Sequence, residues 1–384
     1  MEKALIILNT NSYILSNFIK KQVAHVFETQ IYIIDENLDK TTNEIIRHIN
    51  DLILKENIST CFFQGCYISL INYDFIKQTN FKKKYFFLTD DFDAHEINSQ
   101  TALACDGIMT VCPISQLKYN EKNLNASFYV VESDCELFKN HNLKKDIDIL
   151  FFGAFKADRI KFLKDLENQN KKIKIIQAKD NYLPYNELVK YICRSKIVVN
   201  FSKTGPKKKF YSHRTYPFNY LQLKGKIFMA GFCGTLCLSE YSPSQKIIFG
   251  NHAPTFKNSD EMINEINKYL GDDKLLKDKT KNFADSCKPY IDKINFPKIF
   301  SELSNSNNKL FVKKLPYWYL RCFFIKSLRL IANKNSLKVL YKQFFENISN
   351  FIKYSGFTFP LLLVEAFFHL MYLQMKTIKN KFNK

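Results

Sequence analysis

The stretch whose residue types are best suited to chemistry is 222–241, QLKGKIFMAGFCGTLCLSEY. It predicts a helix that begins near Lys224, Gly225 and Lys226, a turn at Gly234 and Thr235, and then a strand. The first N–H groups of a helix have no partners within the helix, and together with the helix dipole they favour anions. The lysines at this helix start therefore indicate a site for a diphosphate, although a solvated helix start would have the same pattern.

Basic residues also follow a strand predicted at 197–201. The insertion at 202–214, SKTGPKKKFYSHR, contains Lys203, His213 and Arg214 as well as three consecutive lysines at 207–209. Ligands of open parallel sheets bind beyond the carboxyl ends of the strands, so these groups could clamp a diphosphate or an acidic acceptor. A solvated loop is the alternative, and the sequence does not decide between the two.

Residues 222–241 resemble the C-terminal half of group 1 glycosyltransferases, in the branch that includes CgeB-like proteins. The positions that agree with that pattern are Gln222, Lys224, Gly225, Phe228, Cys233, Gly234, Glu240 and Tyr241. The resemblance extends upstream to 147–163, where Gly153 and Arg159 match, and downstream to 259–273, so that it covers about residues 146–290. It implies two Rossmann-like domains that face a central cleft (the GT-B fold), with a nucleotide-sugar donor held by the second. The residues that we expect to hold the donor are Gly153, Arg159, Lys203, His213, Arg214, Lys224, Lys226, Gly234, Thr235 and Glu240.

Two positions depart from the family's pattern. Lys226 stands where the family has Arg, which keeps a positive charge but loses the planar fork that binds phosphate through two hydrogen bonds. Met229 stands where the family has a Glu that hydrogen-bonds the donor ribose, and a thioether cannot do this. Either another group, such as Glu240, makes that contact, or the donor site is degraded and the chain keeps only the fold.

Acidic residues follow the strand predicted at 85–88. Asp90, Asp91 and Asp93 precede His95, and an inverting sugar transfer needs a base near the acceptor hydroxyl. We expect Asp91 and His95 to be the catalytic residues. Asp91 and Asp93 also have the spacing of the DxD motif that binds Mg²⁺ or Mn²⁺ in one-domain (GT-A) glycosyltransferases, but a second Rossmann-like unit argues against that class. A helix cap is the structural alternative.

Two series of alternating strands and helices position these groups. In the first series we predict strands at 4–8, 31–34, 60–63, 85–88, 107–112 and 128–131 and helices at 16–27 and 43–54. After a polar linker at 135–145, we predict strands at 147–152, 173–177, 197–201, 236–238 and 247–249 and helices at 159–166, 185–193, 226–232 and 261–270. Such alternation is typical of parallel sheets with helices on both faces. We expect an acceptor domain (1–140), a donor domain (146–295) and a helical extension (296–384).

The last fifth of the chain is basic and aromatic. From Lys309 onward it has 14 Lys and Arg but only Glu346 and Glu365 as acids, which accounts for +12 of the formal charge of +20. The segments 315–331 and 357–375 add aromatic residues, a composition that suits an anionic membrane surface. The second is close to the ~20 residues that span a bilayer, but Glu365 at mid-membrane would cost about 2.5–3.5 kcal/mol, which favours a helix on the surface. Alternatively, both segments cover the first domain.

Composition and missing motifs disfavour other classes. The chain has 384 residues, 46% of them hydrophobic and 24% charged, which is ordinary for a globular protein. Its ten cysteines include no CxxC pair, which disfavours a zinc ribbon. Their scattered positions indicate a protein of a reducing compartment. GxGxxG, GxxxxGK[ST] and HExxH do not occur, which disfavours nicotinamide, P-loop and zinc-peptidase chemistry. The N-terminus has no apolar run long enough for a signal peptide.

Together these features predict a glycosyltransferase that moves a sugar from a nucleotide-sugar donor to a glycan or lipid-linked glycan acceptor, as in the synthesis of bacterial lipopolysaccharide, lipooligosaccharide or capsule. No metal or other cofactor is required in principle, because cationic groups can stabilise the departing nucleoside diphosphate. We expect a cytoplasmic protein on the inner face of the membrane, without a nucleic-acid partner. The alternative is a degraded GT-B shell that binds the membrane surface.

Overall fold

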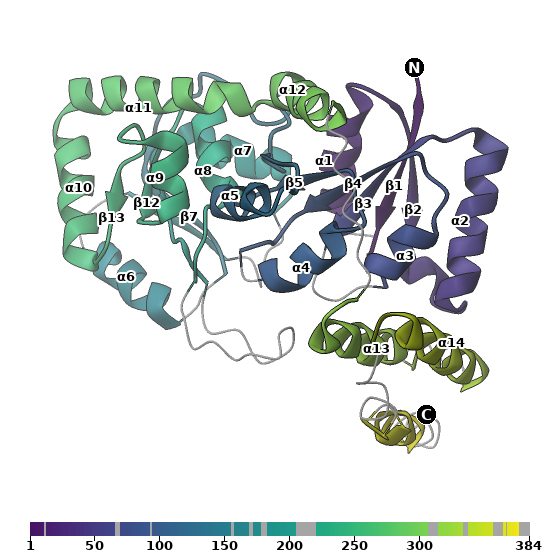
Figure 1. Cartoon of the computed structure of the whole chain (residues 1–384). Coiled ribbons are helices and arrows are strands. Elements are labelled where there is room, and N and C mark those ends of the chain that lie inside the picture. The colour runs from purple at the N-terminus through teal and green to yellow at the C-terminus, as the bar shows by residue number, and fades with distance from the viewer. Residues whose placement is uncertain are drawn as a thin grey trace.

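The computed structural model places the chain in two α/β units, each built on a parallel sheet, followed by a helical C-terminal part (Figure 1). The structure describes residues 1–10, 13–65, 70–92, 94–154, 157–168, 172–177, 183–204, 220–305, 314–332, 337–355, 364–365 and 367–375. This arrangement confirms the predicted fold class of two Rossmann-like sheets with a helical extension.

The first sheet has six parallel strands in the order β2-β1-β3-β4-β5-β6. These strands are β1 (Lys3–Leu8), β2 (Glu28–Ile33), β3 (Thr60–Gly65), β4 (Lys83–Leu88), β5 (Gly107–Thr110) and β6 (Ala126–Phe128). They alternate with α1 (Tyr13–Ala24), α2 (Thr42–Glu56), α3 (Tyr73–Gln78), α4 (His95–Ala102) and α5 (Pro113–Glu121). Every residue of β3 is buried, as expected for a parallel strand with helices on both faces. Local signals set the helix ends: Thr41 and Glu44 form a capping box at the start of α2.

The second sheet has five parallel strands in the order β13-β12-β9-β7-β8. Its strands are β7 (Ile147–Gly153), β8 (Ile173–Gln177), β9 (Ser195–Asn200), β12 (Leu236–Glu240) and β13 (Thr255–Phe256). The helices between them are α6 (Ala157–Glu167), α7 (Tyr185–Arg194), α8 (Gly225–Phe232) and α9 (Pro243–Phe249). A short antiparallel pair, β10 (Lys203–Thr204) and β11 (Tyr220–Leu221), follows β9.

The strand predicted at 247–249 is wrong, because these residues end helix α9. Ser242 accepts a hydrogen bond from the N–H of Gln245, and Pro243 occupies the first helical turn. Both are signals of a helix start. A run of only three apolar residues has no period that distinguishes a strand from a buried helical turn.

Three helices lead from the second unit back to the first: α10 (Ser259–Gly271), α11 (Asp273–Cys287) and α12 (Asp292–Ser304). In Figure 1, α11 runs along the second unit and α12 lies beside α1. Helix α12 packs against α1, β5 and β6, and Asp292 accepts a hydrogen bond from the His25 ring at 3.1 Å. The chain therefore crosses between the units a second time.

Two further helices, α13 (Tyr317–Ala332) and α14 (Leu337–Ser355), pack on the first unit. The hydroxyl of Tyr319 accepts a hydrogen bond from the N–H of Tyr73 at 2.8 Å, and Gln343 accepts one from the N–H of Thr42 at 2.7 Å. The segment 315–331, one of the two predicted to cover the first domain, thus packs on the first unit, whereas Leu370 and Leu373 of the second segment pack against α13 and α14. Within the part of the chain that the structure describes, no helix is both long and apolar enough to cross a bilayer.

Candidate active site

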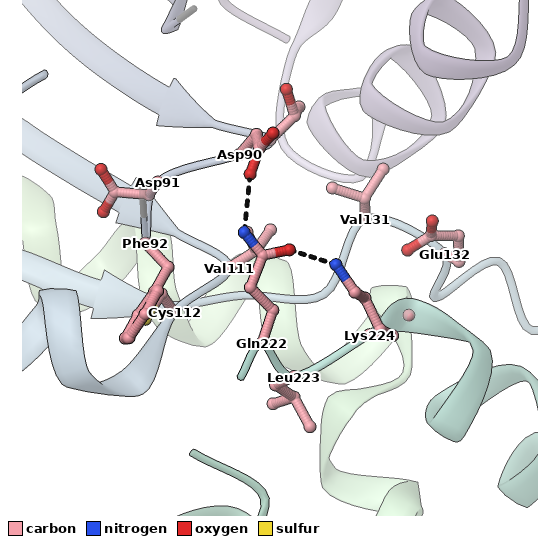
Figure 2. Close-up of a pocket in the computed structure, with 12 residues that line it drawn as sticks. Asp90, Asp91, Phe92, Val111, Cys112, Val131, Glu132, Gln222, Leu223 and Lys224 are labelled. Atoms are coloured by element: carbon pink, nitrogen blue, oxygen red, sulfur yellow. Dashed lines mark hydrogen bonds between the residues drawn. The ribbon is translucent and has the colours of Figure 1, made fainter. Parts of the chain in front are cut away.

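A cavity of about 270 Å³ lies between the two units (Figure 2). The first unit forms one wall with residues that follow β4, β5 and β6, and the second forms the other with the residues that lead into α8. The lining residues are Thr89, Asp90, Asp91, Phe92, Val111, Cys112, Val131, Glu132, Gln222, Leu223, Lys224 and Gly225. The cavity lies at the carboxyl ends of parallel strands, where ligands of such sheets bind.

Lys226 and Gly153 meet at the carboxyl end of β7. Nζ of Lys226 donates a hydrogen bond to the carbonyl oxygen of Phe152. Gly153 has a φ of +136°, which favours glycine, and a Cβ at this residue would overlap Nζ. Burial, and then repulsion from Arg159 and Lys224, lowers the pKa of Lys226 from 10.5 to about 7. An anion bound here would relieve both effects, because it would favour the charged form of the lysine.

Arg159, Lys203 and Glu240 form a hydrogen-bonded group at the ends of β7, β9 and β12. The guanidinium of Arg159 donates to the carbonyl oxygens of Ala154 at 3.0 Å and Lys203 at 2.9 Å. The backbone N–H of Lys203 donates to Oε2 of Glu240 at 2.8 Å. Arg159 also lies close enough to Lys226 to lower the pKa of that lysine. Five of the predicted donor residues therefore gather at this edge of the second sheet: Gly153, Arg159, Lys203, Lys226 and Glu240.

Gln222 connects the two units. Its Nε2 donates to Oδ1 of Asp90 at 3.1 Å, and its Oε1 accepts a hydrogen bond from Nζ of Lys224 (Figure 2). Lys224 is the N-cap residue of α8 and lines the cavity. The two lysines of the predicted helix start therefore have different neighbours: Lys224 faces the first unit, and Lys226 turns toward β7.

Glu132, which follows β6, is a site residue that the sequence analysis missed. Its carboxylate lies against Gly225, because a Cβ at residue 225 would overlap both carboxylate oxygens. Burial raises the pKa of Glu132, against the opposing effect of Lys226 and Lys224. The available signal was an acidic residue directly after a predicted strand, the same signal that led to Asp90.

Asp91 and His95, the predicted catalytic residues, are buried at the base of the loop after β4. Asp91 is 1% exposed, and its carboxylate accepts hydrogen bonds from Asn98 (2.9 Å), Tyr119 (3.0 Å) and Thr110 (2.7 Å). The His95 ring packs against the Tyr119 ring with centroids 4.6 Å apart. Asp91 therefore orders the loop, and the neighbouring Asp90 presents its carboxylate to the cavity.

Gly234 and Thr235 lie at the opposite end of α8 from Lys224. Gly234 follows the helix with a φ of +66°, as is common at helix C-termini. Thr235 donates to the carbonyl oxygen of Ile192 and accepts from Nζ of Lys145, both at 2.7 Å. At 1.5 Å per residue, an eight-residue helix separates its ends by roughly 12 Å. The structure thus does not bring these two predicted residues to the cavity.

Met229 is 3% exposed and belongs to the main hydrophobic core, so the position of the family's Glu faces the core. Asp93, His213, Arg214 and the lysines at 207–209 lie outside the described residues. Over the described ranges, no three His, Cys, Asp or Glu side chains are grouped so that they could hold a metal ion.

Comparisons with known proteins concern the fold and the second unit. Residues 137–285 match the glycosyl transferase-like family, whereas a search of curated protein sequences gives no match. The fold is similar to sucrose-phosphate synthase from Thermosynechococcus elongatus, with a TM-score of 0.53 and 9% identity over 79% of this chain and 99% of that one. It is also similar to Anabaena HepE in complex with UDP-glucose, with a TM-score of 0.51 and 10% identity over 79% and 100%. A Listeria monocytogenes protein named as a UDP-N-acetylglucosamine 2-epimerase has a TM-score of 0.50 and 12% identity over 80% and 98%.

The two parallel sheets and the structural neighbours together define the fold. The chain has the GT-B fold, and residues 137–285 match the glycosyl transferase-like family. The matched residues include the second sheet and all five gathered donor residues. Two sheets do not fit the one-domain GT-A alternative.

Proposed function

We propose that the protein transfers a sugar from a nucleotide-sugar donor to a glycan acceptor, with the donor on residues 146–295 and the acceptor on residues 1–140. The observation that carries this proposal is the group of Lys226, Arg159 and Gly153 at the edge of the second sheet, beside a cavity that the first unit closes. The family match over 137–285 and the UDP-glucose bound to HepE support the same donor class.

The donor's diphosphate would lie between the start of α8 and Lys226. The unpaired N–H groups of a helix start favour an anion, and a buried cation beside it adds charge. As the glycosidic bond breaks, negative charge grows on the leaving diphosphate, and positive groups already in place stabilise it. The negative charge of the bound diphosphate would raise the pKa of Lys226 above about 7 and keep the lysine protonated in the complex.

We assign the base on the acceptor side to Asp90, and we give Asp91 and His95 the role of positioning its loop. The Asp90 carboxylate lines the cavity and is oriented by Gln222. A base must come within hydrogen-bond reach of the acceptor hydroxyl, and Asp91 is too deeply buried for that.

Glu240 is our candidate for the ribose contact, because Met229 faces the core. An ionised carboxylate has about four lone-pair sites, and the bond from the N–H of Lys203 uses one of them. Glu240 could therefore accept hydrogen bonds from two ribose hydroxyls while it holds the loop after β9.

Nucleotide binding tests the donor assignment. UDP-, GDP- and ADP-sugars would be screened by saturation-transfer NMR and thermal shift against the wild type, Lys226→Met and Lys274→Met. Lys274, an exposed residue of α11, is the matched control. We expect one nucleotide to bind the wild type and the control, and to bind Lys226→Met at least ~10 times more weakly, because a hydrogen bond to a charged group is lost. Equal binding by all three proteins would contradict the assignment.

A degraded GT-B shell that binds the membrane surface is the second candidate function. Met229 favours it, since the family's ribose ligand is missing at that position. This candidate predicts that no nucleotide in the screen binds the wild type, so the same measurement separates the two functions.

We further propose that the protein works at the inner face of a membrane, on a lipid-linked or surface glycan such as lipopolysaccharide or capsule. Support comes from a stripe of apolar side chains, 43–68% exposed, spaced three and four residues apart after α14: Val364, Phe367, Phe368, Met371, Tyr372 and Met375. This spacing puts them on one face of a helix, and Leu370 and Leu373 on the other face are buried against α13 and α14. An apolar stripe beside basic residues suits the headgroup layer of an anionic bilayer.

Vesicle co-sedimentation tests the membrane contact. We expect the wild type to bind vesicles that contain phosphatidylglycerol, and the double variant Phe368→Glu, Tyr372→Glu to lose most of that binding. Ile294→Glu, at an exposed apolar residue of α12, is the control. If the double variant binds as well as the control, or if it changes only a dimer into a monomer on size exclusion, the stripe does not contact lipid.

A further inference from the structure

The carboxylate of Glu132 lies where the anion-binding start of α8 opens into the cavity. Glu132 belongs to the first unit, yet its side chain rests on Gly225, the first residue of α8. Figure 2 shows it near Lys224, on the cavity wall. A carboxylate in this place has the charge that the helix start favours.

The titratable groups around Glu132 include two lysines, a tyrosine and an aspartate. Lys224 and Lys226, both from the start of α8, attract its carboxylate. Tyr129, from the same segment, interacts with it, and Asp90, after β4, lines the same cavity. Burial raises the pKa of Glu132 in spite of the lysines, so the neutral form is more accessible than for an exposed Glu.

We propose that Glu132 takes the place of the donor's diphosphate in the free protein, and that donor binding is coupled to the uptake of a proton by Glu132. This inference rests on the proposed function, since it concerns the same donor site. A diphosphate and an ionised carboxylate cannot share the start of one helix, because like charges repel strongly in a partly buried site. A protonated carboxyl instead donates a hydrogen bond to a phosphate oxygen.

The proposal makes donor affinity depend on pH. Because burial raises the pKa of Glu132, this residue takes up its proton at a higher pH than an exposed Glu does, and the donor binds more tightly as the pH falls. Lys226 acts in the same direction, because its protonated form attracts the diphosphate. Variants are therefore needed to separate the two residues: Glu132→Gln removes the first contribution and leaves the second.

Isothermal titration calorimetry with UDP, and with inorganic pyrophosphate as a probe without a nucleoside, tests the proposal. Wild type, Glu132→Gln and Glu136→Gln would be compared at pH 8 and pH 5.5, in two buffers of different ionisation enthalpy so that proton uptake is measured directly. Glu136, an exposed residue of the same segment that bonds to Lys293, is the matched control. Circular dichroism confirms that each variant is folded.

We expect Glu132→Gln to bind UDP on the order of tenfold more tightly than the wild type at pH 8, to take up less of a proton, and to have a smaller advantage at pH 5.5. Glu136→Gln should behave as the wild type. If UDP binds the wild type and Glu132→Gln equally, or binds Glu132→Gln more weakly, the role of Glu132 is overturned and the donor site stands. If neither UDP nor pyrophosphate binds any of the three proteins, the donor site falls and this inference with it.

Discussion

Replacing Lys226 with methionine should stabilise the fold and weaken donor binding at the same time. The pKa of Lys226 moves from 10.5 to about 7 on folding, which corresponds to about 5 kcal/mol against the charged form. The variant loses the hydrogen bond to the Phe152 carbonyl, worth about 1 kcal/mol, and keeps the apolar packing of the side-chain stem. We therefore expect a gain of roughly 1–4 kcal/mol in the free energy of unfolding below pH 7.

The pH dependence has a definite sign. Below pH 7 the lysine is protonated in both states, and the folded protein bears the full cost of the buried charge. Between pH 7 and 10.5 the unfolded chain keeps a proton that the folded chain has lost, so the stability of the wild type rises with pH. Lys226→Met lacks this contribution, and its advantage over the wild type should shrink across that window.

Urea unfolding of the wild type, Lys226→Met and Lys274→Met at pH 6 and pH 9 measures both effects. Donor affinity should fall by about 10- to 150-fold in Lys226→Met, the equivalent of about 1.5–3 kcal/mol for a hydrogen bond to a charged group. If Lys226→Met is less stable than the wild type at pH 6 and has the same pH dependence, Lys226 is not a destabilising buried cation and the reasoning is refuted.

Three further predictions follow from individual contacts. Asp91→Ala should lower the free energy of unfolding by about 3 kcal/mol in a urea titration, because three buried donors lose their acceptor; loss of activity at unchanged stability would instead favour Asp91 as the base. Gly153→Ala should cost about 1–3 kcal/mol through backbone strain and the clash with Lys226, and should reduce donor affinity in the same calorimetric assay. Tyr319→Phe should weaken the attachment of α13 by about 1 kcal/mol, since its hydroxyl accepts from Tyr73; faster hydrogen exchange in α13 with unchanged nucleotide affinity is the expected result.

Much of the fold was predictable because its signals are local. The strand predicted at 173–177 coincides with β8 (Ile173–Gln177), and the helix predicted at 226–232 lies within α8 (Gly225–Phe232). Apolar runs and helical periodicity depend only on neighbours along the chain. The strand prediction at 247–249 is wrong because it also depended on a local pattern, and a run of three residues is too short to have a period.

The site was less predictable, because its parts are distant in the sequence. Asp90 and Gln222 are separated by 132 positions and meet only because the two units pack together. Glu132 reaches the start of α8 for the same reason. No local pattern distinguishes Asp90, whose carboxylate contacts Gln222 of the other unit, from Asp91, whose carboxylate accepts three buried hydrogen bonds within the first unit.

The sequence by itself determined the two series of strands, the positive charge at the start of α8 and the basic, aromatic character of the C-terminal part, because composition and periodicity are properties of the chain. Only the tertiary structure decided which of those charged groups are buried, which face the cavity and which carboxylates oppose them. The physical reason is that burial and the distances between charges, which set the pKa values of Lys226 and Glu132, exist only once the chain is folded.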